Sequence, residues 1–366
     1  MHDVYEQLAF HLSTLGMGLP YREELLEMLR ENLTPTEAKV LLALPTKVAP
    51  LQPVGVDKIA GNINFPRKQL VDILESLSER GLLFSGKTKE GEKGYALQQV
   101  GFGFPQTFFW KVEDTPHAKH MANLVAKYFN RRVTSEAYGS SKTKPFRYIP
   151  VGETIDHATQ AVFPYHMMEE VIQQARVFAV AHCACRMAMR LQEKGCDHPL
   201  EVCLKFDDMA EYTVERGLAR EITKEEALEI IRKSEEAGLV HFVDNSIKDI
   251  KHNCNCCGCA CWNVGSIKRR KIPRDVLMAT YFIRETDKDK CIGCGNCVEI
   301  CPVDAIVIEG DYPAVDEEWC IGCGLCVRQC SSEAARLRLR TDRTDLSPLP
   351  DFVQLHGEIL KEKGLV

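Results

Sequence analysis

A run of four cysteines that occurs twice near the C-terminus constrains this chain more than any other feature. Both copies have the spacing Cys-x2-Cys-x2-Cys-x3-Cys, and the second follows the first at an offset of 29 residues. Glycines inside each run permit tight backbone turns and free amide groups to point inward. Such a loop is built to surround a metal centre rather than to fill an apolar core. The cysteines are Cys291, Cys294, Cys297 and Cys301 in the first run, and Cys320, Cys323, Cys326 and Cys330 in the second.

Over about 55 residues these runs resemble the two-cluster bacterial ferredoxins, in which the fourth cysteine of each run binds the other cluster. The resemblance implies two [4Fe-4S] clusters. Pro302 follows the first run, whereas Ser331 stands at the equivalent place in the second. Proline there shapes a turn and binds no iron, so both clusters are still predicted, with four-cysteine zinc sites as the alternative. The predicted ligand sets are Cys291, Cys294, Cys297 and Cys330 for one cluster, and Cys320, Cys323, Cys326 and Cys301 for the other.

Nine further cysteines lie upstream of the two runs. Five of them fall within eight residues, and that many thiolates would repel one another unless cations neutralised them. One or two further iron–sulfur clusters are predicted here; one cluster plus a zinc, zinc alone, an unusual cluster with an open site, and a metal-free redox dithiol are the alternatives. The candidate ligands are Cys183, Cys185, Cys196, Cys203, Cys254, Cys256, Cys257, Cys259 and Cys261.

Neighbouring residues refine this prediction. The side chains of adjacent Cys256 and Cys257 point in different directions from an extended backbone, which favours two different centres or a bridging role. His182 could bind iron or relay protons, but a hydrogen bond near a cluster is the simpler interpretation. His198, His241 and His252 are expected to be ordinary histidines. Arg186 and the basic run of Lys268, Arg269, Arg270, Lys271 and Arg274 could offset cluster charge; the run could instead dock an acidic carrier or form a solvated face.

The N-terminal part has a different character. Thr34 and Glu37 form a predicted capping box, and residues 66–80 carry apolar side chains along one helical face. Two short strand-like runs around a polar tip follow. The order of helices and a two-stranded wing over residues 34–100 resembles a winged helix-turn-helix.

Taken together, residues 34–340 resemble multi-cluster ferredoxin-like proteins of strict anaerobes. The residues that carry this resemblance are His182–Arg186, Cys196, Cys203, Cys254–Cys257 and the eight cysteines of the two runs. The resemblance implies an electron-transfer role in an oxidoreductase system, with redox proteins or complex subunits as partners. It identifies no substrate.

The predicted fold class is α+β, in a multidomain chain with a winged-helix-like N-terminal domain, a mixed α/β cysteine-rich middle and a ferredoxin-like C-terminal domain. The predicted divisions are a helical, winged-helix-like domain at 1–100, a connecting aromatic and helical segment at 101–145, a cysteine-rich domain at 146–284, a two-cluster ferredoxin domain at 285–342 and a tail at 343–366.

Composition narrows the setting. The chain has 366 residues, 17 cysteines and a formal net charge of −6, which gives no sign of a bulk nucleic-acid binder. Residues 1–10 lack the basic start and apolar core of a signal peptide, and no apolar run has the length of a membrane span. We therefore expect a cytoplasmic protein whose thiols hold metal.

Three functions are compatible with these features. Electron transfer through iron–sulfur clusters is preferred. An oxidoreductase with a catalytic cluster in the middle is the second. A redox-responsive DNA-binding regulator is the least favoured, because acidic residues share the helix and wing that would meet DNA. Neither a dinucleotide-binding nor a P-loop signature occurs in the sequence.

Overall fold

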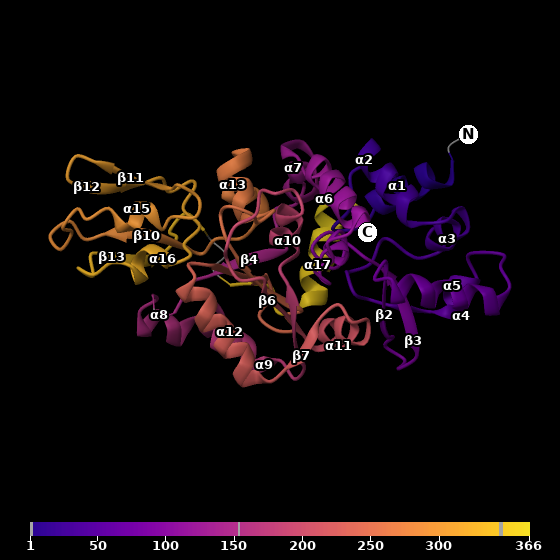
Figure 1. The fold of residues 1–366 in the computed structure, drawn as a ribbon. Helices are drawn as coiled ribbons and strands as arrows, with labels where there is room; N and C mark the ends of the chain where they lie inside the picture. The colour runs from indigo at the N-terminus through magenta and orange to yellow at the C-terminus, as the bar shows by residue number, and fades with distance from the viewer. Residues whose placement is uncertain (1–2, 153, 344–346) are drawn as a thin grey trace.

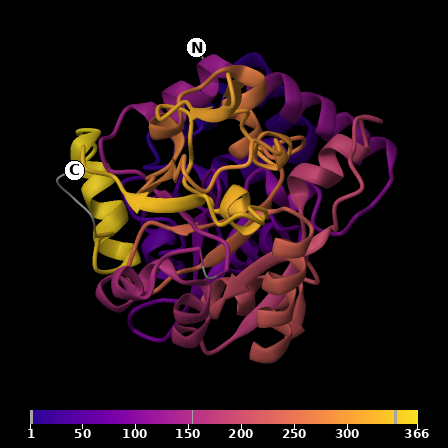
Figure 2. The ribbon, with the colours of Figure 1, turned by 90° about the vertical axis from the view of Figure 1, so that its left-hand side faces the viewer.

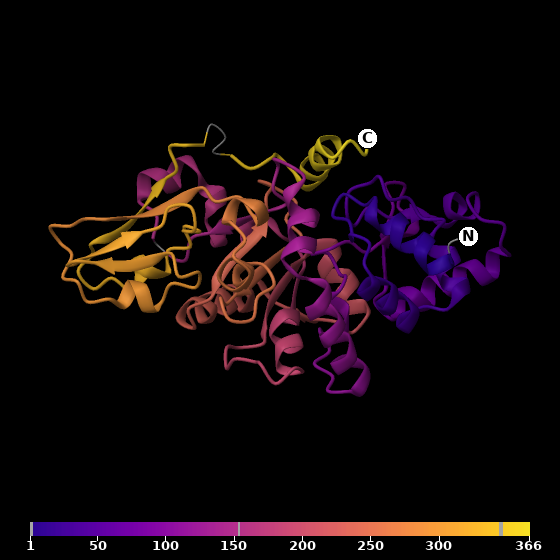
Figure 3. The ribbon, with the colours of Figure 1, turned by 90° about the horizontal axis from the view of Figure 1, so that it is seen from above.

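The computed structural model describes residues 3–152, 154–343 and 347–366. It shows an elongated molecule with the N-terminal helices at one end, a six-stranded sheet in the middle and the two cysteine runs at the other end (Figure 1). The same order along the long axis is seen from above (Figure 3). Helices and sheets both contribute, so the fold is α+β as predicted.

The N-terminal unit combines helices with a small antiparallel sheet in the order β1-β3-β2. The predicted capping box is present: the Thr34 hydroxyl accepts from the Glu37 amide at 3.2 Å, and the Glu37 carboxylate accepts from the Thr34 amide at 2.7 Å. The short strand β1 was not expected. The elements are α1 (Val4–Ser13), α2 (Glu23–Asn32), α3 (Pro35–Leu41), β1 (Val54–Gly55), α4 (Val56–Ala60), α5 (Arg67–Glu79), β2 (Leu83–Lys87) and β3 (Lys93–Leu97).

The segment after the wing is part of the core rather than a loose connection. Phe102, Phe109 and Trp110 are almost fully buried, and they belong to one apolar cluster that continues from α1 into the cysteine-rich part. Their aromatic area explains this placement, because burial of such side chains contributes strongly to folding. The elements are η1 (Gln106–Phe108), α6 (Pro116–Tyr128) and α7 (Arg131–Gly139).

A six-stranded antiparallel sheet forms the middle of the molecule, in the order β4-β8-β9-β6-β5-β7. Its strands are β4 (Phe146–Ile149), β5 (Phe178–His182), β6 (Glu201–Phe206), β7 (Arg220–Ile222), β8 (Val240–Asp244) and β9 (His252–Cys256). The helices around it are α8 (His157–Val162), η2 (Pro164–His166), α9 (Met168–Gln174), α10 (Ala184–Arg190), α11 (Asp207–Glu215), α12 (Lys224–Glu236), α13 (Val264–Arg270) and α14 (Arg274–Leu277).

The two cysteine runs lie on loops between small strand pairs, in front of the central sheet when the molecule is viewed from that end (Figure 2). Strand β10 pairs with β13, and β11 pairs with β12. The elements are β10 (Phe282–Thr286), α15 (Asn296–Glu299), β11 (Ile306–Glu309), β12 (Tyr312–Val315), α16 (Leu325–Arg328) and β13 (Ala335–Leu339).

The last segment is not a free tail. It forms α17 (Phe352–Glu362), which buries Phe352, Leu355 and Ile359 against the rest of the molecule. Just beyond it, the Lys363 ammonium donates to the Gly16 carbonyl at 2.6 Å, so the two ends of the chain meet. Among the described residues, no helix has both the length and the apolar character needed to cross a membrane.

Candidate metal centres

The eight cysteines of the two runs line two separate pockets of about 20 Å³ each. Each pocket takes three cysteines from one run and the fourth from the other, which is the grouping expected from the sequence. Gly295 and Gly324, with φ of 81° and 80°, precede α15 and α16 and turn the chain sharply. The outer pocket has Cys291, Cys294, Cys297 and Cys330; the inner pocket has Cys301, Cys320, Cys323 and Cys326.

The two pockets differ in their exposure to solvent. Cys294 in the outer pocket is exposed, whereas Cys320, Cys323 and Cys326 in the inner pocket are buried. Burial raises the pKa of Cys326 to about 12, and the nearby Arg284 guanidinium opposes that rise. Arg284 lines both pockets and is itself 3% exposed. A buried positive charge is therefore held where two sets of thiolates would need compensation.

Strand pairing brings six of the other nine cysteines around one cavity of about 60 Å³. Leu204 on β6 pairs with Asn253 on β9, so the preceding Cys203 lies opposite Cys254. Residues two apart on a strand share a face, which places Cys256 beside Cys254. Cys183 and Cys185 follow the end of β5, and Cys261 lies on the loop after β9. The cavity cysteines are Cys183, Cys185, Cys203, Cys254, Cys256 and Cys261.

The six cavity thiols lie close enough that each shifts the pKa of its neighbours, in one continuous series. The order is Cys183, Cys185, Cys261, Cys256, Cys254 and Cys203.

The pKa shifts of the six thiols alternate in direction along this series. Hydrogen bonds from Cys203 and Cys256 lower the pKa of the Cys254 thiol to about 5. Burial would raise the pKa of Cys261, but hydrogen bonds from Cys185 and Cys256 lower it instead. The pKa values of the three donors, Cys185, Cys203 and Cys256, are raised in turn. Because metals bind thiolates, metal binding at thiols with raised pKa values would release protons.

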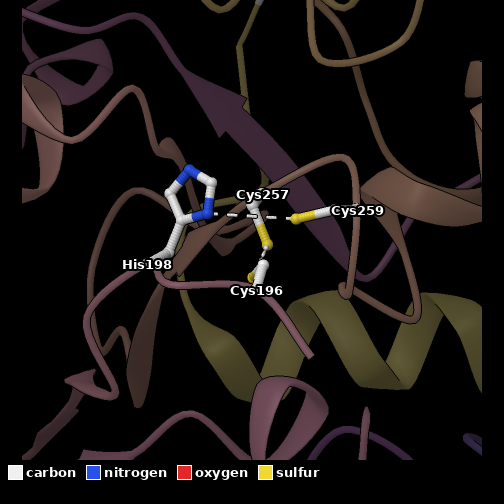
Figure 4. A group of neighbouring side chains, drawn as sticks. All are labelled: Cys196, His198, Cys257 and Cys259. Atoms are coloured by element: carbon white, nitrogen blue, oxygen red, sulfur yellow. Dashed lines mark hydrogen bonds between the residues drawn. The ribbon is translucent and has the colours of Figure 1, made fainter. Parts of the chain in front are cut away.

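The remaining three cysteines form a second, separate group with a histidine (Figure 4). The ligand atoms of Cys196, His198, Cys257 and Cys259 all lie within 4.8 Å of one another. The Cys196 and Cys257 sulfurs are 3.9 Å apart, and the Cys259 sulfur is 3.9 Å from His198 Nδ1. Burial, and then the Arg186 charge, lower the pKa of His198, which favours the neutral imidazole that binds metals.

The structure places His198 beside three cysteine sulfurs, whereas the sequence predicted an ordinary histidine at this position. The Cys-x-His spacing of Cys196 and His198 is the one feature of the sequence that could have indicated this group. The other two cysteines, Cys257 and Cys259, lie on a loop about 60 residues later in the chain. The separation of Cys256 from Cys257, by contrast, follows the expectation that adjacent side chains serve different centres. His182 has the simpler role, since its Nδ1 lies 2.9 Å from the Trp110 carbonyl oxygen.

Arginines hold the cysteine loops in place. Arg186 is fully buried; it donates from Nε to the Cys257 sulfur at 3.5 Å and from Nη2 to the Asn255 carbonyl at 2.5 Å. Nearby cysteines raise its pKa although burial opposes this. In the basic run, Arg269 donates to the carbonyls of Gly258 and Cys261 at 2.8 and 2.9 Å.

Two further members of the basic run join the middle to the C-terminal pockets. Arg274 donates to the Cys320 carbonyl, and Lys268 pairs with Asp304 at 2.8 Å. Arg274 is buried, so the alternative of an ordinary solvated face does not hold for it, whereas Arg269 and Lys268 remain exposed while their side chains bond to the neighbouring loops.

The inner pocket adjoins the central cysteines. A Cβ added to Gly258, between Cys257 and Cys259, would come within 2.0 Å of the Pro302 carbonyl oxygen next to Cys301. The Val151 amide donates to the Cys323 carbonyl at 2.9 Å.

Tyr148 lies near cysteines of both the central cavity and the inner pocket. Burial raises its pKa well above the usual range, and Cys261, Cys256 and Cys323 all add to the rise. Its hydroxyl has no hydrogen-bond partner among the described residues. This buried hydroxyl therefore lies within electrostatic reach of both the central cavity and the inner pocket.

The two pockets at the C-terminal end are similar to the sites of ferredoxin-type iron–sulfur domains. Residues 285–307 and 313–336 match the family described as 4Fe-4S binding domain. One subunit of an ion-translocating oxidoreductase complex from Methanosarcina acetivorans is 35% identical over 78 residues, which are 20% of this chain and 27% of that relative. The chain thus matches about a quarter of the relative's length. No solved structure matches the chain. These findings support an iron–sulfur electron-transfer role.

Proposed function

We propose that this chain is an electron-transfer component of an anaerobic oxidoreductase system, in which the two C-terminal centres exchange electrons with a metal centre in the six-cysteine cavity. The observation that carries the proposal is the sequence of sites along the molecule: an outer pocket open to solvent, a buried inner pocket, and the central cavity beyond the Gly258–Pro302 contact. Iron–sulfur clusters bound at these sites would supply one-electron carriers.

The chain's own residues supply the environment. Cys291, Cys294, Cys297 and Cys330 would hold the outer cluster, and Cys301, Cys320, Cys323 and Cys326 the inner one. Arg284 contributes a buried positive charge between them. Hydrogen bonds, burial and nearby charge are the means by which a protein sets cluster potential. The amides of Ala305 and Ala335 donate to the sulfurs of Cys301 and Cys330 at 3.2 and 3.4 Å.

The outer pocket also has the surface of a docking site for a redox partner. Ile292 lines it and is 69% exposed, and Ile308, also at the pocket, is 43% exposed. Exposed apolar side chains that cluster at a redox centre favour a protein partner. The match to a subunit of an oxidoreductase complex supports partners of this kind.

The N-terminal unit is proposed to be a winged-helix-like module that serves protein packing rather than DNA binding. Arg67 at the start of α5 forms an ion pair with Asp57, and Lys93 on the wing pairs with Glu75 at 2.5 Å. These pairs engage basic groups that DNA binding would need. The module also contacts α11, where the Tyr212 hydroxyl donates to the Leu83 carbonyl at 3.1 Å.

The test replaces one ligand of the outer cluster in the full chain. We expect Cys294→Ala to lose about four iron atoms per chain and one low-potential paramagnetic signal, and to slow reduction of the central centre by a protein donor. Ser331→Ala, an exposed change beside Cys330, is the matched control and should keep both signals. Unchanged iron content and spectra in Cys294→Ala would refute the ligand assignment.

A further inference from the structure

We infer that Cys196, His198, Cys257 and Cys259 form a mononuclear zinc site, separate from every iron–sulfur centre of the molecule. The four ligand atoms come from two loops, residues 191–200 after α10 and residues 257–263 after β9. Three thiolates and one imidazole are a common donor set of structural zinc sites.

The distances distinguish a single ion from a cluster. Four ligands at tetrahedral angles, about 2.3 Å from zinc for sulfur and 2.0–2.1 Å for nitrogen, lie about 3.6–3.8 Å from one another. The measured separations are 3.9 Å for the Cys196 and Cys257 sulfurs and 3.9 Å for the Cys259 sulfur and His198 Nδ1. In a cubane each ligand binds a different iron, so ligand sulfurs must stand farther apart.

The site has a physical purpose in the fold. Its two loops adjoin the cavity: Cys261 lies on the 257–263 loop, directly after Cys256, while the 191–200 loop connects α10, which carries Cys185, to β6, which carries Cys203. Arg190 donates to the carbonyls of Cys196 and His198 at 3.0 Å each, and Arg269 to that of Gly258 at 2.8 Å. One ion would therefore join these two loops beside the cavity without sharing a ligand with it.

Metal analysis of the anaerobically purified full chain tests this site. We expect one zinc per chain, lost in both His198→Ala and Cys259→Ala, while iron and sulfide contents stay at the wild-type values. His157→Ala, an exposed histidine on α8, is the matched control and should keep the zinc. His198→Cys preserves a four-ligand set and should retain the metal, which separates ligation from a general folding role.

Cobalt provides a second measurement. Co²⁺ exchanged into the chain should show the visible absorption of a tetrahedral cobalt thiolate, and His198→Ala should abolish it. Iron loss in His198→Ala accompanied by retained folding, or zinc retention in both Ala variants, would overturn the proposal.

A second inference deepens the proposed function and rests on it: the six cavity cysteines hold one iron–sulfur centre larger than a cubane. Six cysteines line a single cavity, whereas a cubane takes four. The cavity of about 60 Å³ is three times the volume of each C-terminal pocket, which is about 20 Å³. We propose that Cys183, Cys185, Cys203, Cys254, Cys256 and Cys261 all bind this centre.

Iron counting with single variants tests it. Two C-terminal cubanes contribute about eight irons, so a third cubane would give about twelve and a larger centre more than twelve. We expect more than twelve, and we expect each single Cys-to-Ala change among the six to reduce the central iron. A count of twelve with two dispensable cysteines overturns the inference but leaves the proposed function intact. A count of eight overturns both, because the cavity then holds no iron.

Discussion

Arg284 is a single side chain placed between two metal pockets. It lines both the outer and the inner pocket and is nearly inaccessible to solvent. Burial raises the pKa of the Cys297 and Cys326 thiols, and the Arg284 charge opposes that rise. The same interaction that favours a thiolate favours the more negative, reduced form of a cluster.

We predict that Arg284→Gln lowers the reduction potentials of both C-terminal centres. A unit charge several ångströms away contributes about 1–2 kcal/mol at an effective dielectric constant near 20, which corresponds to a shift on the order of 50 mV. Redox titration followed by electron paramagnetic resonance would measure it. Arg336→Gln, which removes an exposed arginine paired with Glu285, is the control. Equal potentials in both variants would contradict the role given to Arg284.

Gly258 fits a place where a larger residue does not. Its Cβ would approach the Pro302 carbonyl oxygen to 2.0 Å, so the central cysteine loop and the inner pocket would have to separate. We predict that Gly258→Ala lowers the free energy of unfolding by about 1–3 kcal/mol, as overpacking does. Anaerobic chemical denaturation would measure the change.

A matched glycine lies on α17. Nothing within 4 Å would meet a Cβ at Gly357, so Gly357→Ala should leave stability unchanged or raise it by about 0.5–1 kcal/mol through helix propensity. If the two alanine variants proved equally stable, the tight Gly258–Pro302 contact would not be a structural requirement.

Helix α17 carries a buried histidine, His356, that packs against the aromatic segment near Phe102. His356 lies against Phe102 and Phe352, with ring centroids 5.3 and 4.5 Å away. Burial lowers its pKa to about 3, with Asp244 opposing and His252 and Lys363 adding to the shift. Below pH 6.5 the unfolded chain therefore binds a proton that the folded chain does not.

It follows that stability falls as the pH falls from about 6.5 towards 3. Between pH 7.5 and 5.5 the loss from this one group is about 1.4 kcal/mol. We predict that His356→Leu removes that part of the pH dependence. Between pH 7.5 and pH 5.5 the free energy of unfolding should therefore fall by about 1.4 kcal/mol less in the variant than in the wild type. Denaturant unfolding at both pH values measures it; a constant difference between the two proteins would show that His356 does not titrate on unfolding.

The elements also explain what could be predicted from the sequence. The ligand groups of the two cysteine runs depend on local spacing, and the structure brings the same residues together. The division of the nine central cysteines depends on the pairing of β5 with β6 and of β6 with β9, which brings together residues about 20 to 50 positions apart in the sequence. His198 was missed because its three thiol partners converge only in the folded chain. The aromatic segment near Trp110 and helix α17 belong to the core for the same non-local reason.

At the scale of the whole molecule, the elements that carry the two C-terminal pockets, such as α15 and α16, lie at one end, and those that carry the central cavity, such as α10 and β6, lie nearer the middle (Figure 1). This order favours the outer pocket as the point of exchange with a partner, since Cys294 is exposed there while three of the four inner cysteines are buried. The N-terminal unit lies at the opposite end and shares an apolar core with the middle.

A substitution on the apolar surface at the outer pocket tests whether a redox partner docks there. We predict that Ile292→Glu slows reduction of the chain by a reduced two-cluster ferredoxin about tenfold, because a charge replaces an apolar contact at the centre of the docking face. Dithionite, which needs no docking face, should reduce wild type and variant at the same rate. Val162→Glu alters a side chain of similar exposure, 65% against 69%, on α8 away from the outer pocket, and should change neither rate. Stopped-flow absorbance measures all three proteins; equal slowing by Ile292→Glu and Val162→Glu would place the partner elsewhere.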